Sequence, residues 1–166
     1  NLIKLRQLVR GALAEMRSLL FELRPSALEN ADLETLLPQL ADAFTGRTRI
    51  PGSVTINGRS DLPPEVTVTF YRITQELFNN ISKHAFDTEV TLTCEQALDE
   101  VHLSISDNGR GFNTTSSPAE KMGLAIMQER ADAILAELSL DSQPGEGTHM
   151  LSHWQAHINK KNGESA

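Results

Sequence analysis

The stretch PEVTVTFYRITQELFNNISKHA, residues 64–85, predicts a long amphipathic helix. Its apolar side chains recur every three or four residues, which places them on one face of a helix. Pro63 and Pro64 fit the start, because the first amide groups of a helix have no intrahelical partner. The apolar face consists of Val66, Phe70, Ile73, Leu77 and Ile81. We therefore expect this face to pack on a core.

Three polar side chains of the same helix, Glu76, Asn80 and Lys83, point away from this apolar face. At 100° per residue these three side chains fall within an arc of about 60°. Asn80 could supply a direct ligand to Mg²⁺, which prefers oxygen atoms and keeps several waters. Glu76 could hold a metal-bound water or polarise an attacking group, and Lys83 could meet a phosphate. An ordinary solvated helix face with a Glu–Lys pair would show the same pattern.

Working outward, residues 89–95 and 100–107 alternate between apolar and polar side chains, which predicts two strands joined by a hairpin around residues 96–99. We expect Val90, Leu92 and Cys94 to share one face, and Val101, Leu103 and Ile105 to share another. Asp107 continues the second series, so its carboxylate should point to the buried face at a strand end. A buried carboxylate needs a hydrogen-bond donor, and the exocyclic amine of adenine is one.

Glycines cluster in three segments around these elements. Gly109 and Gly111 in SDNGRGF (106–112) permit close approach of the backbone to a ligand, although a tight turn explains them equally well. Gly123 in KMGL (121–124) stands at the start of a helix expected at about 123–135, whose free amides could bind phosphate. GEGT (145–148) could offer a hydroxyl and open backbone to a phosphate, and a hairpin turn between two strands explains it as well.

Upstream, residues 2–24 predict one helix with an apolar heptad seam. The seam consists of Leu2, Leu5, Val9, Ala12, Met16, Leu19 and Leu23. The helix either packs on its own domain or pairs with other helices in a bundle, and the narrow, regular seam favours the bundle. A linker at 26–31, a helix at 32–44 and a strand at 49–58 follow. Pro51 and Gly52 place that strand at a sheet edge.

Composition excludes several classes of function. A formal net charge of −7 argues against a nucleic-acid binder. Cys94 is the single cysteine, so an intrachain disulfide is impossible and a Cys-based zinc site is not expected. No run of about 18 apolar residues exists, so we expect no direct membrane contact. His149, His153 and His157 recur every four residues, and about 13 Å between such positions on one strand prevents two from sharing a zinc ion.

Together these segments resemble the ATPase family shared by histidine kinases, type II topoisomerase ATPase subunits, Hsp90 chaperones and MutL-type repair proteins. ELFNNISKHA (76–85) is similar to the histidine kinase N box, DNGRGF (107–112) to the G1 box, MGL (122–124) to part of the G2 box, and GEGT (145–148) to the last glycine box. FYRITQE (70–76), LRP (23–25) and MQERA (127–131) resemble the nitrate-sensor and desaturase-sensor subfamily.

The resemblance implies an α+β fold, a two-layer α/β sandwich of the Bergerat type with helices on one face of a mixed sheet and a long N-terminal helix before it. It implies ATP and Mg²⁺ as cofactors, Asn80 on Mg²⁺, Glu76 as the catalytic residue near the metal water, and residues 113–122 as a lid over ATP. The implied ATP-binding residues are Asn80, Lys83, His84, Asp107, Gly109, Gly111, Phe112, Gly123, Leu124, Gly147 and Thr148.

We therefore expect the catalytic part of a two-component sensor histidine kinase, an enzyme fragment. None of its five histidines fits the family's phosphoacceptor position, and Lys121 stands where many relatives have glycine. Residues 1–25 would be part of a dimerisation and phosphotransfer domain, 26–158 the catalytic domain, and 159–166 a disordered tail. The expected partners are a second copy of the protein, through the N-terminal helix, and a response regulator receiver domain.

The expected location is the cytoplasm, with a parent protein that is either soluble or membrane-anchored. Two alternatives stay open. One is another ATPase of the same superfamily or an anti-sigma serine kinase. The other is a non-catalytic dimerisation module with a degenerate ATP fold.

Overall fold

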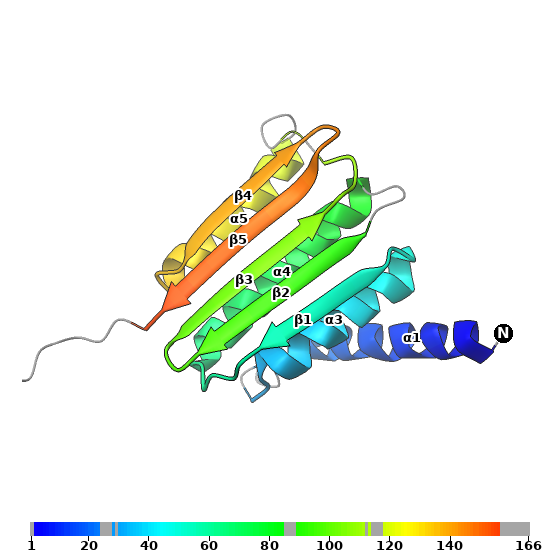
Figure 1. Cartoon of the computed structure of the whole chain (residues 1–166), viewed down its shortest axis with the longest axis horizontal. Coiled ribbons are helices and arrows are strands. Elements are labelled where there is room, and N and C mark those ends of the chain that lie inside the picture. Colours follow the sequence, from blue (N-terminus) through cyan, green and yellow to red (C-terminus); the bar gives the residue numbers. More distant parts are fainter. Residues whose placement is uncertain are drawn as a thin grey trace, which may run out of the picture.

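A computed structural model describes residues 2–23, 28, 30–84, 89–111, 113 and 118–156. The chain forms a two-layer α+β sandwich, in which one sheet is covered on a single face by helices (Figure 1). The expected fold class is therefore confirmed. The order of elements along the chain also agrees with the sequence analysis. Within the described ranges, no helix combines the length and apolar character that crossing a membrane requires.

The helices are α1 (Leu2–Leu23), α3 (Leu33–Thr48), α4 (Pro64–His84) and α5 (Pro118–Ala133). Helix α3 starts at the N-cap Asp32, whose carboxylate accepts a hydrogen bond from the Thr35 amide. It runs through Pro38 and ends where Arg49 adopts a left-handed backbone with φ 63°. The end expected at residue 44 was therefore four residues short.

The sheet contains β1 (Gly52–Asn57), β2 (Val90–Ala97), β3 (Glu100–Asp107), β4 (Glu137–Gln143) and β5 (Gly147–Gln155), in the spatial order β1-β2-β3-β5-β4. β1 pairs with β2 in parallel and the other pairs are antiparallel, so the sheet is mixed as expected. β1 lies at an edge, directly after Pro51, which confirms the prediction from the proline.

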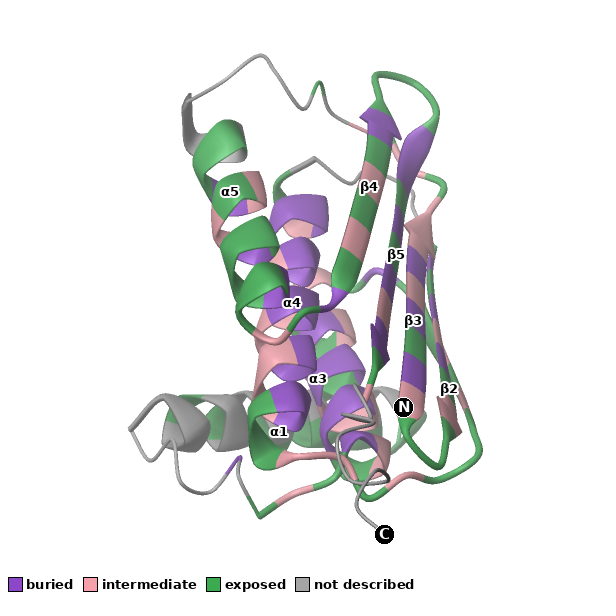
Figure 2. Ribbon diagram, turned by 90° about the vertical axis from the view of Figure 1, so that its left-hand side faces the viewer, coloured by how far each residue is buried: buried purple, intermediate pink, exposed green. Residues whose placement is uncertain are grey.

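The core fills the space between the helices and one face of the sheet (Figure 2). Leu92 pairs with Ile105 and Cys94 with Leu103 across β2 and β3, so the apolar residues of both strands share the same face. The expectation that the two strands use different faces was wrong, because the two-residue turn at 98–99 keeps the pleats of the hairpin in register. Burial raises the pKa of the Cys94 thiol to about 12, as expected for a core cysteine.

The start of α5 differs most from the sequence prediction. The helix begins at Pro118, five residues before the expected start at residue 123. Proline is favoured at the first helical position because its missing N–H has no partner there. Residues 118–122, expected to be lid loop, are thus helical. Residues 114–117 of the expected lid and the tail from 157 lie outside the described residues.

Candidate functional site

Asp107 ends β3 on the face that the helices cover. Its cross-strand neighbours are Val90 on β2 and Thr148 on β5. One carboxylate oxygen, Oδ1, accepts a hydrogen bond from the Gly109 amide at 2.8 Å. The other, Oδ2, is buried and has no hydrogen-bond partner among the described residues. Because a buried acceptor without a partner costs about 1–3 kcal/mol, a donor from a ligand that reached Oδ2 would remove this cost.

The backbone around Asp107 makes close contacts at two glycines, Gly147 and Gly111. Gly147 has φ 78°, and a side chain there would collide with the Asp107 carbonyl oxygen. Gly111 has φ 58°, and a side chain there would collide with the carbonyl oxygens of Gln143 and Gly147. The loop after β3 and the β4–β5 turn therefore interlock at a distance that only glycine allows. This interlock fixes the strand end that carries the Asp107 carboxylate.

Thr148 is buried beside Asp107, and its hydroxyl lies 3.1 Å from that of Ser142. Ser142 also donates a hydrogen bond to the Gly147 carbonyl. From the sequence, the Thr148 hydroxyl is a candidate phosphate contact. The structure places Thr148 in the buried row that holds Asp107, directly opposite it across β3 and β5. Sequence reasoning missed Ser142, the next-to-last residue of β4, because nothing in the polar sequence around it indicates that its side chain is buried.

Glu76 and Asn80 lie where α4 meets α5. Asn80 is buried and Glu76 is half-buried. A Cβ atom on Gly123 would stand 2.9 Å from Glu76 Oε1 and 3.3 Å from Asn80 Nδ2. The alternative of a simple solvated helix face therefore fails for Asn80. The carboxylate and the amide form one polar patch, and the glycine leaves room for both.

Gly123 does not stand at the start of a helix, as the sequence predicted. Gly123 lies in the second turn of α5, so its amide belongs to the helix interior and cannot serve as a free phosphate donor. Because Gly123 has no side chain, α5 can approach Glu76 and Asn80 closely. Leu124 is half-buried and packs against the core.

The remaining predicted residues lie near the Asp107 group or the Glu76–Asn80 pair, or lie outside the described residues. Lys83 is exposed near the end of α4, and Gly109 donates its amide to Asp107. The side chain of His84 and the residue Phe112 lie outside the described part of the chain. Asn108, which sequence reasoning missed, anchors the loop because its Oδ1 accepts the Glu89 amide at 2.7 Å.

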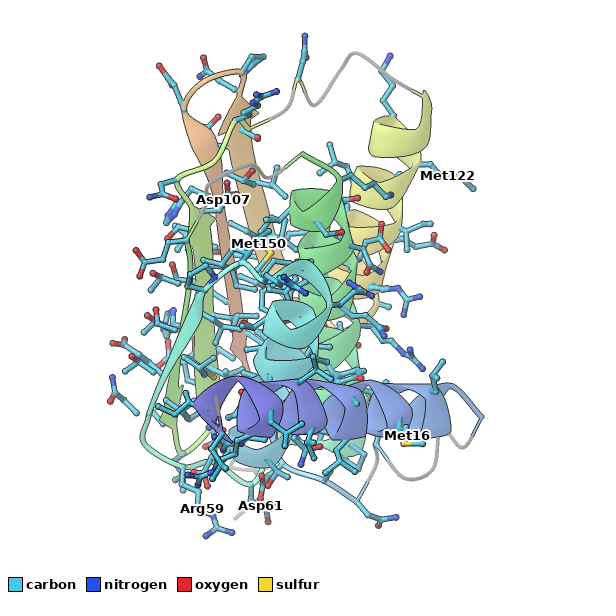
Figure 3. All side chains as sticks on the ribbon, turned by 90° about the vertical axis from the view of Figure 1, so that its right-hand side faces the viewer. Met16, Arg59, Asp61, Asp107, Met122 and Met150 are labelled. Atoms are coloured by element: carbon cyan, nitrogen blue, oxygen red, sulfur yellow. The ribbon has the colours of Figure 1, made fainter. Side chains whose placement is uncertain are left out.

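Figure 3 shows the positions of Asp107, Met150 and Met122 relative to the sheet and the helices. Asp107 lies at the end of β3, on the side of the sheet that faces α4, and Met150 lies further along the same face. Met122, on α5, points away from the body of the protein and is largely exposed. The site thus has an acceptor at the strand end and side-chain oxygen atoms of Glu76 and Asn80 at the α4–α5 contact. An adenine amine fits the first group and a hard cation with phosphates fits the second.

Comparison with known proteins agrees with this geometry. Residues 65–157, more than half of the chain, match the family model described as histidine kinase-, DNA gyrase B-, and HSP90-like ATPase. The chain is 30% identical over 148 residues to the signal transduction histidine-protein kinase/phosphatase DegS of Brevibacillus brevis, covering 89% of this chain and 38% of DegS. It is 32% identical over 162 residues to the sensor protein VraS of Staphylococcus epidermidis, covering 97% of this chain and 45% of VraS.

Among solved structures, the fold resembles that of the blue-light activated histidine kinase EL346 of Erythrobacter litoralis. The TM-score is 0.60 with 24% sequence identity, and the match covers 75% of this chain and 45% of the other. The chain thus spans less than half the length of DegS and of VraS.

Proposed function

Because this chain belongs to the histidine kinase-, DNA gyrase B-, and HSP90-like ATPase family, we propose that it is the ATP-binding catalytic part of a two-component sensor histidine kinase. It transfers the γ-phosphate of ATP to a histidine on a dimerisation helix outside residues 1–166, for onward transfer to a response regulator receiver domain. The observation that carries the proposal is the buried, unpartnered Oδ2 of Asp107, at a strand end that the glycine interlock fixes.

In this proposal Asp107 selects the adenine base. Oδ1 is already committed to the Gly109 amide, so Oδ2 is free to accept the exocyclic amine. The backbone beside the base lacks side chains at three positions, Gly109, Gly111 and Gly147, so the base can approach it closely. Thr148, next to Asp107 in the register, shapes the same end of the pocket.

The α4–α5 contact serves the phosphate end. Asn80 supplies an oxygen ligand to Mg²⁺, and Glu76 holds a metal-bound water or accepts the ring proton of the attacking histidine. Lys83 and His84 lie near the phosphates or the ribose, and Phe112 and Leu124 complete the pocket. Bound Mg²⁺ neutralises charge on the phosphates. In the transfer, the acceptor nitrogen forms a bond to the γ-phosphorus, the bond to the β-phosphate oxygen breaks, and ADP leaves.

Helix α1 supports the assignment of a homodimer. Five residues of its heptad seam are well exposed to solvent: Leu2, Leu5, Val9, Met16 and Leu19. Pairing with a second helix would remove these apolar side chains from water, which stabilises the pair. Residues 1–25 would thus belong to the dimerisation domain and 26–158 to the catalytic domain. ATP and receiver domains are cytoplasmic, so the catalytic part works there whether or not the parent protein is anchored in a membrane.

The proposal is tested by supplying the acceptor separately. The chain is mixed with radiolabelled ATP, Mg²⁺ and the isolated dimerisation domain of DegS, with its acceptor histidine intact or replaced by alanine. We expect label on the intact acceptor only, as an acid-labile phosphohistidine. Asp107→Asn in the chain should abolish the label, whereas the exposed-turn variant Asp99→Asn should retain it.

Each other outcome points to a different alternative. ATP binding and hydrolysis with label on neither acceptor would favour another ATPase of the superfamily. Label on a serine would favour a serine kinase. No ATP binding with or without Mg²⁺ would favour a non-catalytic dimerisation module and would contradict the proposal.

A further inference from the structure

Three metal-ligating side chains meet on the outer face of the sheet, the face without helices. Glu100 and His102 come from β3 and His153 comes from β5, where the register places it directly opposite His102. The two imidazole rings stack with centroids 4.2 Å apart and planes 3° from parallel. Both Nε2 atoms lie 2.9 Å from the same oxygen, Oε1 of Glu100. We call Glu100, His102 and His153 the outer-face cluster.

We propose that the outer-face cluster binds one Zn²⁺ ion through His102 Nε2, His153 Nε2 and the Glu100 carboxylate. Its three ligand atoms all lie within 4.8 Å of one another. Ligand atoms at about 2.0–2.1 Å from a tetrahedral zinc ion are roughly 3.3 Å apart, so the spacing suits one ion once the two imidazole rings tilt out of their parallel stack and aim both Nε2 atoms at it. Two imidazoles with one carboxylate favour zinc over Mg²⁺, which prefers oxygen ligands alone.

The neighbouring strands supply carboxylates that suit the second nitrogen of each ring. Glu137 on β4 is the cross-strand partner of His153, and its Oε2 lies 4.0 Å from His153 Nδ1. Glu95 on β2 is the cross-strand partner of His102. Histidines that bind zinc usually donate their other ring N–H to a carboxylate or carbonyl, which orients the ring and raises its basicity. A row of carboxylate, imidazole, imidazole and carboxylate therefore crosses four strands.

Access to the cluster is open. The side chains of His102, His153 and Glu100 are 51%, 31% and 34% exposed. His102 and His153 border a shallow depression on the sheet that is also lined by Thr93, Ser104 and Leu151. Three protein ligands leave a fourth tetrahedral position for water or for a group from a partner.

Each imidazole Nε2 lies at hydrogen-bond distance from Glu100 Oε1, and a ring that carries its proton on Nε2 donates it to this oxygen. Zinc requires the Nε2 lone pair, so a neutral ring must carry its proton on Nδ1. For His153 that proton would face the Glu137 carboxylate. The ion-free arrangement therefore already holds the two rings, the carboxylate and the proton acceptor in place.

The cluster is separate from the proposed nucleotide site. Asp107 and Thr148 belong to the face of the sheet that the helices cover, whereas His102 and His153 belong to the opposite face. Substitutions in the cluster should therefore leave ATP binding unchanged.

The test is calorimetric titration of the whole chain with zinc chloride, free of nucleotide and in the presence of excess Mg²⁺. We expect one ion per chain. His153→Gln and His102→Gln should each weaken binding by more than about 100-fold. Glu137→Gln should weaken it by roughly tenfold, the smaller effect typical of an orienting partner. The matched control is His149→Gln, which removes an exposed imidazole from the same strand and should leave the affinity unchanged.

Circular dichroism and ATP binding check that each variant is folded. The proposal is overturned if His153→Gln binds zinc as tightly as the unaltered chain. It is also overturned if His149→Gln is the variant that loses binding, or if one ion is bound per two chains with dimerisation. Absence of binding at about 1 mM zinc, a concentration at which any specific site would be occupied, would overturn it as well.

Discussion

Gly123 on α5 lies directly against Glu76 on α4, so that a methyl group at position 123 would stand 2.9 Å from the carboxylate oxygen Oε1. The same methyl group would stand 3.3 Å from Asn80 Nδ2. The place of α5 on α4 therefore sets the positions of the two residues to which we assign Mg²⁺ and phosphate chemistry. A glycine in the second turn of a helix lowers helix stability, and at this position it leaves room for the two side chains.

Gly123→Ala should fold normally and lose function. Alanine stabilises a helix by about 1 kcal/mol relative to glycine, and Glu76 can swing aside because the crowded atom is the end of a flexible side chain. We expect unfolding free energy within about 1 kcal/mol of the original chain and phosphate transfer at least about tenfold slower. Met122→Ala, at an exposed neighbouring position, is the control and should leave the transfer rate unchanged. An unimpaired transfer rate in Gly123→Ala would remove Glu76 from the proposed mechanism.

Asn80→Asp should disrupt the Mg²⁺ dependence of ATP binding. The substitution buries a second carboxylate beside Glu76, which favours protonation or displacement of one of them. The control is Asn79→Asp, one residue earlier, whose side chain accepts a hydrogen bond from Arg47 at 3.1 Å and does not face the patch. ATP titrations with and without Mg²⁺ measure the effect. Equal Mg²⁺ dependence in both variants would contradict the assignment of Asn80.

Gly147→Ala should destabilise the fold and weaken ATP binding together. Alanine is strained by about 1–2 kcal/mol at a positive φ, and here its methyl group also collides with the Asp107 carbonyl. Gly145→Ala is the matched control, because its φ is 91° but the space around it is open. Urea unfolding should therefore show a clearly larger loss at position 147 than at 145. Equal losses at the two positions would mean that the interlock with Asp107 contributes nothing.

Asp32→Ala should cost about 1 kcal/mol of stability at neutral pH, the usual effect of losing an N-cap. The hydrogen bond from Thr35 holds the pKa of the Asp32 carboxyl below its ordinary value. A lowered folded pKa means that the stabilisation is present above the unfolded pKa of about 3.9 and is lost as pH falls through the folded value. The difference between the original chain and Asp32→Ala should thus narrow below about pH 4.

Asp32→Asn keeps a side-chain oxygen at the cap without a titrating group. Its unfolding free energy, measured by urea titration at neutral and acidic pH, should lack this pH-dependent component. If acid lowers the unfolding free energies of Asp32→Asn and of the original chain by the same amount, a group other than Asp32 causes the pH dependence.

Local periodicity predicted the elements that carry most of the site. The apolar stripe gave α4 its bounds to within one residue, and the alternation in β2 and β3 placed Asp107 at the end of β3, on the covered face. These predictions succeeded because a helix face and a strand face are fixed by neighbours a few residues apart.

Long-range relationships could not be predicted in the same way. The stacking of His102 on His153 depends on the register between β3 and β5, whereas the histidine spacing was judged along a single strand. The contact of Gly123 with Glu76 likewise depends on how α5 packs on α4. The early start of α5 did have a local signal, since Pro118 followed by Ala119 and Glu120 is typical of a first helical turn.

The most direct test of the nucleotide site is a calorimetric comparison of ATP with inosine triphosphate, which carries a carbonyl where adenine carries the amine. We expect the original chain to bind ATP at least about 100-fold more tightly, because an acceptor such as Asp107 Oδ2 rejects a base without a donor. Asp107→Asn should abolish ATP binding, since its amide must either face the amine with its own N–H or give up the Gly109 hydrogen bond. Equal affinity for the two nucleotides, or unchanged ATP affinity in Asp107→Asn, would contradict the assignment of Asp107 to the adenine amine.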